Sequence, residues 1–303
     1  MSANSAEDKQ NIEPAYERPP RIPRGALLPT GVLISFLGSM AGIGGGLFAV
    51  PVLHFLRGLP LSRAVATSLG LVLTTATLST ITESFHAQNS LRPVVLACVV
   101  GGALVGIQVG FRIAERIGGR ALRILFISLL LIAAARVAYA LLGPSSSVLG
   151  PGLEPPALSL GQGISCALIG LLGGGVAPLF GIGGGLIVTP ALFVVFPAAG
   201  FVTARAIALA NAMVTGSRSL YLHHTAGRVV WGELAWLVPG AAVGAILGTQ
   251  LVHGDGVARY AQGILLATLL FTAVRFLRDL EKTPASKADS KDEASPADGL
   301  DQA

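Results

Sequence analysis

Apolar residues fill long unbroken stretches of this chain instead of alternating with polar residues at a helix or strand period. Runs without any Asp, Glu, Lys or Arg are of a length that suits membrane crossing, because a bilayer core of about 30 Å takes about 20 helical residues. Six runs suit one span each, if a charged residue is allowed near an end. The pattern therefore predicts an all-α polytopic membrane protein. The runs are 25–56, 64–82, 93–111, 124–135, 155–204, 206–217, 234–252 and 260–274.

Two of these runs are too long for one upright span. The run 155–204 would form a helix of about 75 Å, and 25–56 is also too long for one span but too short for two. Both contain the same pattern, since 42–51 reads GIGGGLFAVP and 181–190 reads GIGGGLIVTP, 139 residues apart. Consecutive glycines allow a tight reversal, including positive φ where the turn needs it. Each long run is therefore predicted to form a helical hairpin with a glycine tip.

Other features recur at nearly the same spacing and indicate a duplicated unit. Gly102, Gly106 and Gly110 match Gly240, Gly244 and Gly248, and small residues every four positions are typical of a helix contact face. The stretch 62–64 resembles 203–206 with a slip of about three residues, which pairs Arg63 with Arg205. The predicted organisation is a polar tail 1–25, a first membrane repeat 26–142, a linker 143–157, a second membrane repeat 158–278 and a polar tail 279–303.

The distribution of positive charge favours hairpins over single crossings of the glycine-rich runs. Single crossings would place 11 Lys and Arg in the cytoplasm and 8 outside, leaving aside Arg136 and Arg218. Hairpins with both termini in the cytoplasm give 16 inside and 3 outside, the latter being Arg92, Arg205 and Arg259. The positive-inside rule favours the second split. A hairpin plus three spans is an odd number of crossings, so the second repeat would be inverted, as in many secondary transporters.

Composition excludes several classes of protein. The chain is 52% hydrophobic and 12% charged, whereas soluble domains carry about 25% charged residues. The two tails hold 7 of the 21 Lys and Arg and 11 of the 16 Asp and Glu, which leaves too few charges to solvate a fold of the remaining size. A soluble enzyme, a disordered chain and a nucleic-acid binder are excluded. Cys98 and Cys166 lie in apolar runs and form no disulfide framework.

The glycine tips are the strongest candidate for chemistry. A helix that starts after such a break has unsatisfied N–H donors and the positive end of its dipole at the tip, which together make an anion site. Two such ends near the midplane would form a positive pocket without any buried cationic side chain. The alternative is that the glycines serve only close helix packing. The candidate substrate-binding glycines are Gly44, Gly45, Gly46, Gly183, Gly184 and Gly185.

Two polar residues in the span 203–225 are further candidates. Arg218 could attract an anion, or its long side chain could extend to the inner interface. Asn211 lies two turns away on about the same face, where its amide could bind an oxyanion or link two helices. Glu83 and Glu233 lie at span ends, so no carboxylate falls in mid-span and the coupling of transport is open. No catalytic or metal-binding motif occurs, so neither an enzyme activity nor a cofactor or metal is expected.

The paired glycine motif, with Pro51 and Pro190 closing its two copies, resembles the TauE/SafE family of sulfite and organosulfonate exporters. The resemblance implies a permease that moves a small sulfur-containing anion out across the cytoplasmic membrane of a prokaryote. Its partners would be the anion and membrane lipid, with no nucleic acid, and the oligomeric state is open. The alternatives are an anion channel or uniporter for another small oxyanion or carboxylate, and a membrane assembly subunit that transports nothing.

The charge split predicts which loops face the cytoplasm. Single cysteines introduced in the loops 57–63 and 112–123 should be protected from an impermeant thiol reagent added outside, while a cysteine in 143–157 should be labelled. Labelling of a cysteine in 112–123 from outside would contradict the inverted-repeat topology.

Overall fold

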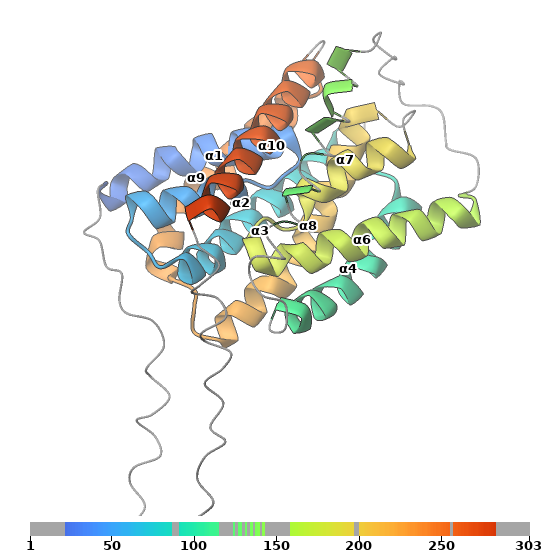
Figure 1. The fold of residues 1–303 in the computed structure, drawn as a ribbon. Coiled ribbons are helices and arrows are strands. Elements are labelled where there is room, and N and C mark those ends of the chain that lie inside the picture. Colours follow the sequence, from blue (N-terminus) through green and yellow to red (C-terminus); the bar gives the residue numbers. More distant parts are fainter. Residues whose placement is uncertain are drawn as a thin grey trace, which may run out of the picture.

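Every element that the structure, a computed structural model, describes is a helix (Figure 1). It describes residues 22–86, 91–114, 158–196, 200–254 and 257–282, with isolated positions between 124 and 142. The predicted span 120–142, the linker 143–157 and most of both tails lie outside the described residues. The helices are α1 (Leu27–Ala41), α2 (Gly46–Pro51), α3 (Leu61–Phe85), α4 (Pro93–Ala114), α6 (Leu160–Phe180), α7 (Gly185–Val195), α8 (Gly200–Thr225), α9 (Trp231–Leu251) and α10 (Val257–Lys282), with short turns η1 (Arg24–Ala26) and η2 (Val52–Leu56).

The first glycine-rich run forms a hairpin. Helix α1 ends where Gly42 takes a left-handed conformation, and Gly44 and Gly45 also have positive φ before α2 begins. After α2 and the π-helical turn η2, the chain is back at its starting side, because Arg57 Nη1 donates to the carbonyl of Ile22 (2.6 Å). The prediction of a returning hairpin, rather than a single crossing, is therefore confirmed for this run.

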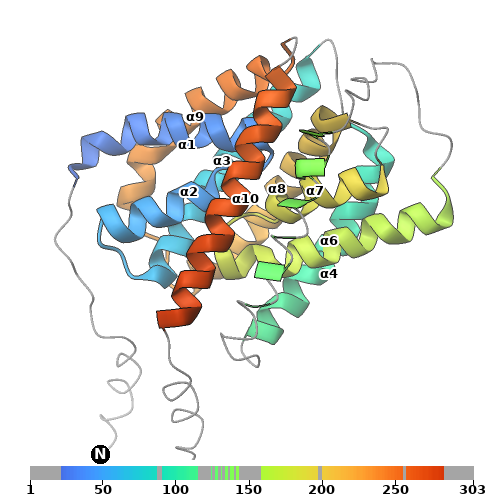
Figure 2. The same cartoon turned by 45° about the horizontal axis from the view of Figure 1, so that its top comes forward.

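The second glycine-rich run forms a matching hairpin. Gly181, Gly183 and Gly184 have positive φ between α6 and α7. The start and end of this run, at Leu158 and Phe196, pack against the same apolar cluster. Figure 2 shows α1 and α2 on one side of the molecule and α6 and α7 on the opposite side, so that the two tips approach each other from opposite directions.

Contacts between the two halves are reciprocal. The α-carbon of Gly46 packs so closely on the Gly181 carbonyl that a Cβ atom would overlap its oxygen. The equivalent contact joins Gly185 to Gly42, because a Cβ atom at Gly185 would lie 2.5 Å from the carbonyl oxygen of Gly42. The second contact is the first one with the roles of the two halves exchanged. A two-fold axis between the halves produces contacts of this kind. The inverted orientation of the two repeats across a membrane stays a prediction.

Both glycine tracks are helix contact faces, as predicted. Gly102, Gly106 and Gly110 of α4 pack on backbone carbonyls of α6. Gly240 and Gly244 of α9 pack likewise on carbonyls of α1, and Gly248 completes that track. Each hairpin therefore packs its first arm against a helix of the other half, with α3 and α8 between the two pairs (Figure 1). Small residues allow this close approach in a bilayer, where no hydrophobic effect drives helices together.

Five of the described helices are long and apolar enough to cross a membrane. Helix α8 has sufficient length but is not among them, because it carries Arg205, Asn211 and Arg218 among its apolar residues. Two of these three polar residues are buried in protein, since Arg205 and Asn211 are both fully inaccessible. The five segments are Arg24–Ala41, Arg63–Phe85, Pro93–Gly110, Leu160–Phe180 and Trp231–Leu251.

A single methyl group should distinguish the contact face of α4 from its exposed face. A Cβ atom at Gly106 would overlap the Leu171 carbonyl oxygen, whereas one at Gly101 would meet nothing within 4 Å. We expect Gly106→Ala to cost about 1–3 kcal/mol of stability through overpacking. Gly101→Ala should be neutral or stabilising by up to about 1 kcal/mol, since Ala favours helix. Thermal unfolding in detergent measures both, and equal melting temperatures would contradict the assigned contact face.

Candidate functional site

The two glycine tips meet between α3 and α8. Val72 of α3 is fully buried and touches both tips, because a Cβ atom at Gly44 would lie 3.1 Å from Val72 Cγ1 and one at Gly183 would lie 2.5 Å from it. Ala212 of α8 lies against Gly183 on the other side. The crossing point of the hairpins is thus enclosed by the two central helices and lies inside the protein.

The helix starts at both tips have no side-chain caps. Gly45 and Gly184 are the N-cap residues of α2 and α7, and neither can supply a capping side chain. Within the described part of the chain, no carbonyl accepts a hydrogen bond from the N–H of Gly46 or Gly185. The first N–H groups of a helix need partners from outside it, and they carry the positive end of the helix dipole. These two N–H groups are therefore left without a carbonyl acceptor, as an anion site at the tips would require.

Asn211 is the most unusual side chain near the tips. It is completely buried, and neither its amide oxygen nor its amide nitrogen has a hydrogen-bond partner in the structure. Thr215, one turn further along the same face of α8, donates to the carbonyl of Gly183 (2.7 Å), so this face of α8 lies against the second tip. A buried polar group normally finds a partner, and an unpaired one costs about 1–3 kcal/mol. Of the two uses predicted for Asn211, this arrangement favours ligand binding over linking two helices.

The structure does not bring Arg218 to the tips. Its side chain is exposed, and its guanidinium lies over the ring of Tyr221, 5.7 Å from the ring centroid. This placement favours the alternative in which the long side chain extends to an interface. Of the predicted site residues, the six glycines lie at the hairpin crossing, Asn211 lies on α8 one turn from Thr215, which bonds the second tip, and Arg218 lies away from the crossing.

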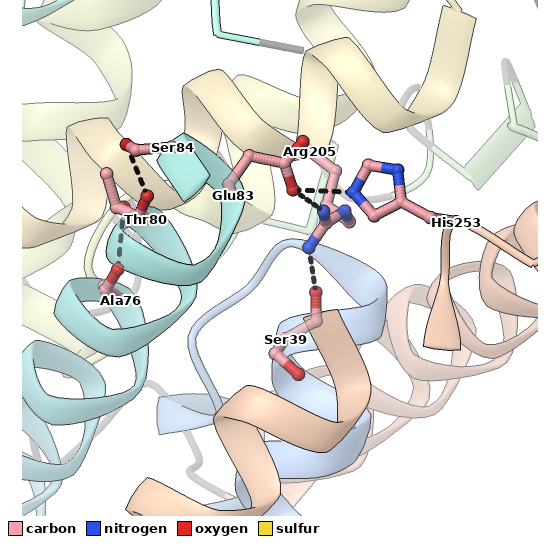
Figure 3. Close-up of polar contacts among 7 residues, drawn as sticks. All are labelled: Ser39, Ala76, Thr80, Glu83, Ser84, Arg205 and His253. Atoms are coloured by element: carbon pink, nitrogen blue, oxygen red, sulfur yellow. Dashed lines mark hydrogen bonds and ion pairs between the residues drawn. The ribbon is translucent and has the colours of Figure 1, made fainter. Parts of the chain in front are cut away.

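A buried ion pair lies beside the first tip. Arg205 is fully buried, and its Nη2 donates to Glu83 Oε2 (2.5 Å) while its Nη1 donates to the carbonyl of Ser39 (3.1 Å). His253 Nε2 lies 3.0 Å from the same Glu83 oxygen (Figure 3). A Cβ atom at Gly42 would lie 2.9 Å from Arg205 Cγ, so the arginine stem touches the tip.

This cluster corrects two expectations from the sequence. Arg205 does not lie in an outer loop, since α8 begins at Gly200 and places it in the second helical turn, inside the protein. The expectation that the tips have no buried cationic side chain beside them is also wrong. Arg205 is tolerated there because Glu83 compensates its charge and Ser39 accepts a second hydrogen bond.

The contacts also correct the alignment of the two repeats. Gly181 packs against the α-carbon of Val65, and Gly42 packs against the α-carbon of Arg205, so Arg205 matches Val65 and not Arg63. The same shift of 140 residues matches Asn211 with Leu71, which packs against Gly45. Two polar residues of α8 therefore take the places of two apolar residues of α3. The frame is close to two-fold, but these two polar residues have no polar counterpart at the equivalent positions of the first half.

A second buried ion pair lies at the far end of the core. Glu233, at the start of α9, accepts hydrogen bonds from Nε (2.8 Å) and Nη2 (2.6 Å) of Arg57, and Arg24 Nε lies 3.5 Å away. Sequence reasoning gave Glu83 and Glu233 no role because both lie at span ends. The available signal was their rarity, since few acidic residues lie between the tails.

Comparisons with known proteins agree with this architecture. The chain matches the family described as "Sulfite exporter TauE/SafE" over residues 3–137 and 166–299, one segment in each half. Because the match covers most of its length, the chain belongs to this family, which confirms the resemblance noted in the glycine motifs.

Two similar relatives are named as transporters. A "Probable membrane transporter protein" of Haemophilus influenzae is 38% identical over 80 residues, which are 24% of this chain and 30% of that protein. The "Probable membrane transporter protein YunE" of Bacillus subtilis is 28% identical over 247 residues, 74% of this chain and 87% of that protein. No solved structure matches. The protein is a membrane transporter by family.

Two arginines of α8 should differ sharply in their effect on stability. Removing one partner of a buried ion pair leaves an uncompensated charge and costs about 3–5 kcal/mol, so Arg205→Met should lower the yield and melting temperature strongly. Arg218→Met should change stability by less than about 0.5 kcal/mol, because the side chain is exposed. Thermal unfolding of both variants in detergent measures this difference in stability. An Arg205→Met protein as stable as the parent would contradict the ion pair.

Proposed function

We propose that this protein is a permease that exports a small sulfur-containing oxyanion, such as sulfite, thiosulfate or an organosulfonate, across the cytoplasmic membrane of a prokaryote. The observation that carries the proposal is the meeting of two uncapped helix starts at the hairpin crossing, with the unpaired amide of Asn211 one helical turn from Thr215, which donates to the carbonyl of Gly183. Membership of the sulfite exporter family supports a sulfur-containing substrate. Both termini are proposed to be cytoplasmic, as the charge distribution predicts.

The donors at the tips suit a compact tetrahedral or pyramidal oxyanion. Backbone N–H groups and an amide N–H are neutral, so they bind a charged oxygen through several hydrogen bonds without holding it as a fixed cation would. Their places are set by glycines, whose positive φ and close contacts leave no room for a side chain at the tip. A site of this kind favours small anions that are released readily, as a transport cycle requires.

Flux through the purified protein separates a transporter from a membrane assembly subunit that transports nothing. A permease alone in liposomes should move thiosulfate, sulfite or a sulfonate, whereas an assembly subunit should move none. A thermal-shift screen over sulfite, thiosulfate, sulfonates and carboxylates identifies the anion class, because a ligand that binds the folded state stabilises it by mass action. Stabilisation by carboxylates alone would move the proposal to another substrate class.

Asn211→Leu provides the sharpest test of the site. Leu71 occupies the equivalent place in the first half, so leucine fits this environment. Replacing two unpaired buried polar groups with an apolar side chain should leave stability unchanged or raise it by about 1 kcal/mol or more. Transport, and the thermal shift caused by the anion, should be lost. A variant that becomes more stable and inactive would show a residue kept for binding.

Met213→Leu is the matched control, because it conserves volume two positions along the same helix and should change neither property. Normal transport by Asn211→Leu would contradict a binding role. Valine at Gly45 or Gly184 is a weaker test, since both residues have positive φ and a side chain would strain the backbone whatever its effect on binding.

A further inference from the structure

The guanidinium of Arg205 has one donor left over. Arg205 is fully buried, and its Nη1 and Nη2 are engaged by Ser39 and Glu83, but its Nε has no partner. The arginine stem packs on Gly42 of the first tip. An arginine presents Nε–H and Nη–H side by side, in a geometry that matches two oxygens of one anion. The unpaired Nε–H could therefore bind one oxygen of an anion beside the tip, and it is one of the two donors that a bidentate site needs.

The other half of that site is occupied by Glu83. Glu83 has charged or titratable neighbours from three parts of the chain: Arg205 from α8, His253 from the turn after α9, and His86 at the end of α3 itself. From α1 the Ser39 carbonyl reaches the cluster through Arg205. The rings of His86 and His253 are stacked with centroids 3.9 Å apart. Glu83 thus connects the buried arginine to a stacked histidine pair, in which the His253 side chain is only 5% exposed.

The net charge of Arg205 and Glu83 determines whether a proton must accompany an anion that binds beside them. Arg205 and ionised Glu83 together carry no net charge. An anion that adds to this pair would leave a net negative charge in a buried region, which is costly at low dielectric. One proton that arrives with the anion removes this cost for a monovalent anion and lowers it for a divalent one.

We propose that Arg205 exchanges Glu83 for the transported anion, and that Glu83 takes up a proton in the exchange, so that the protein moves one proton together with each anion. In this step the anion accepts hydrogen bonds from Nε–H and Nη2–H of Arg205, and the carboxylate it displaces becomes a carboxylic acid. His253, which contacts Glu83 and stacks on His86, is placed to pass the proton to Glu83. When the anion leaves, the proton leaves and the ion pair forms again. The proposal rests on the proposed function.

The other buried carboxylate does not fit this role. Glu233 is held by Arg57 through two hydrogen bonds and has Arg24 nearby, so it faces two cations rather than one. Its cluster lies at the opposite end of α3, where Arg57 also bonds Ile22 at the start of the hairpin. Glu83 and Glu233 are the buried carboxylates of the described chain, which makes Glu233 a matched control.

The first measurement uses the unmodified full-length protein in liposomes that contain a pH-sensitive dye. Methanesulfonate and thiosulfate are suitable probes because both stay fully ionised around neutral pH, so any proton that moves belongs to the protein. We expect the lumen to acidify as either anion enters, and an imposed pH gradient to drive uptake. Anion flux without proton movement would overturn the coupling and leave the proposed function intact. Absence of any flux would instead overturn the proposed function.

The second measurement assigns the proton to Glu83. In the unmodified protein the dissociation constant for methanesulfonate should rise with pH, up to about tenfold per pH unit for linkage to one proton. Glu83→Gln keeps the size of the side chain and cannot ionise, so its binding should be independent of pH and its anion flux should carry no protons. Glu233→Gln should retain the pH dependence of the unmodified protein. Retention of that dependence by Glu83→Gln would overturn the assignment.

A double variant keeps the test decisive if Glu83→Gln does not fold. Glu83→Gln with Arg205→Gln replaces the ion pair by two amides, which leaves no buried charge unpaired. This protein should fold, bind methanesulfonate at least tenfold more weakly than the parent, and show no pH dependence. Parent-like affinity with a parent-like pH dependence would overturn the roles of both residues.

Discussion

The whole structure depends on non-helical backbone that is buried where the two hairpins cross. Such backbone is tolerated at membrane depth only when protein surrounds it, and here each tip is covered by the other tip, by α3 and by α8. The Gly38 carbonyl accepts hydrogen bonds from Ile43 (2.9 Å) and Gly44 (3.2 Å), which completes the end of α1. The glycines are required because a Cβ atom at Gly46 would overlap the backbone of the opposite tip.

This crossing brings the two halves together in a frame that is nearly two-fold, and the function that we propose depends on its departure from symmetry. The tips supply equivalent neutral donors from both halves. Arg205 and Asn211 of α8 take the places of Val65 and Leu71 of α3, and Glu83 of α3 pairs with Arg205. A duplicated scaffold therefore supplies the geometry, and side chains that differ between its two central helices supply the chemistry that we propose distinguishes an anion from other solutes.

The buried charges are the part of the site that sequence reasoning missed. Arg205, Glu83 and Glu233 lie near the ends of apolar runs, where a charged residue is normally explained by contact with the interface. Their burial follows from the paths of helices that are distant in sequence, since Glu83 lies in the last turn of α3 and Arg205 lies in α8. A lone buried charge would destabilise the fold, so their pairing had to be seen in three dimensions before a role could be assigned.

By itself the sequence determined the class of protein, the duplication, the two glycine-tipped hairpins and the packing role of the glycine tracks. Each of these follows from local properties: run length against bilayer thickness, the conformational freedom of glycine and the spacing of small residues on a helix. Only the tertiary structure decided that Arg205 matches Val65, that Asn211 has no partner and that Arg218 lies at the surface. The physical reason is that burial and pairing of a side chain depend on which distant helix lies opposite it, and periodicity along one helix does not contain that information.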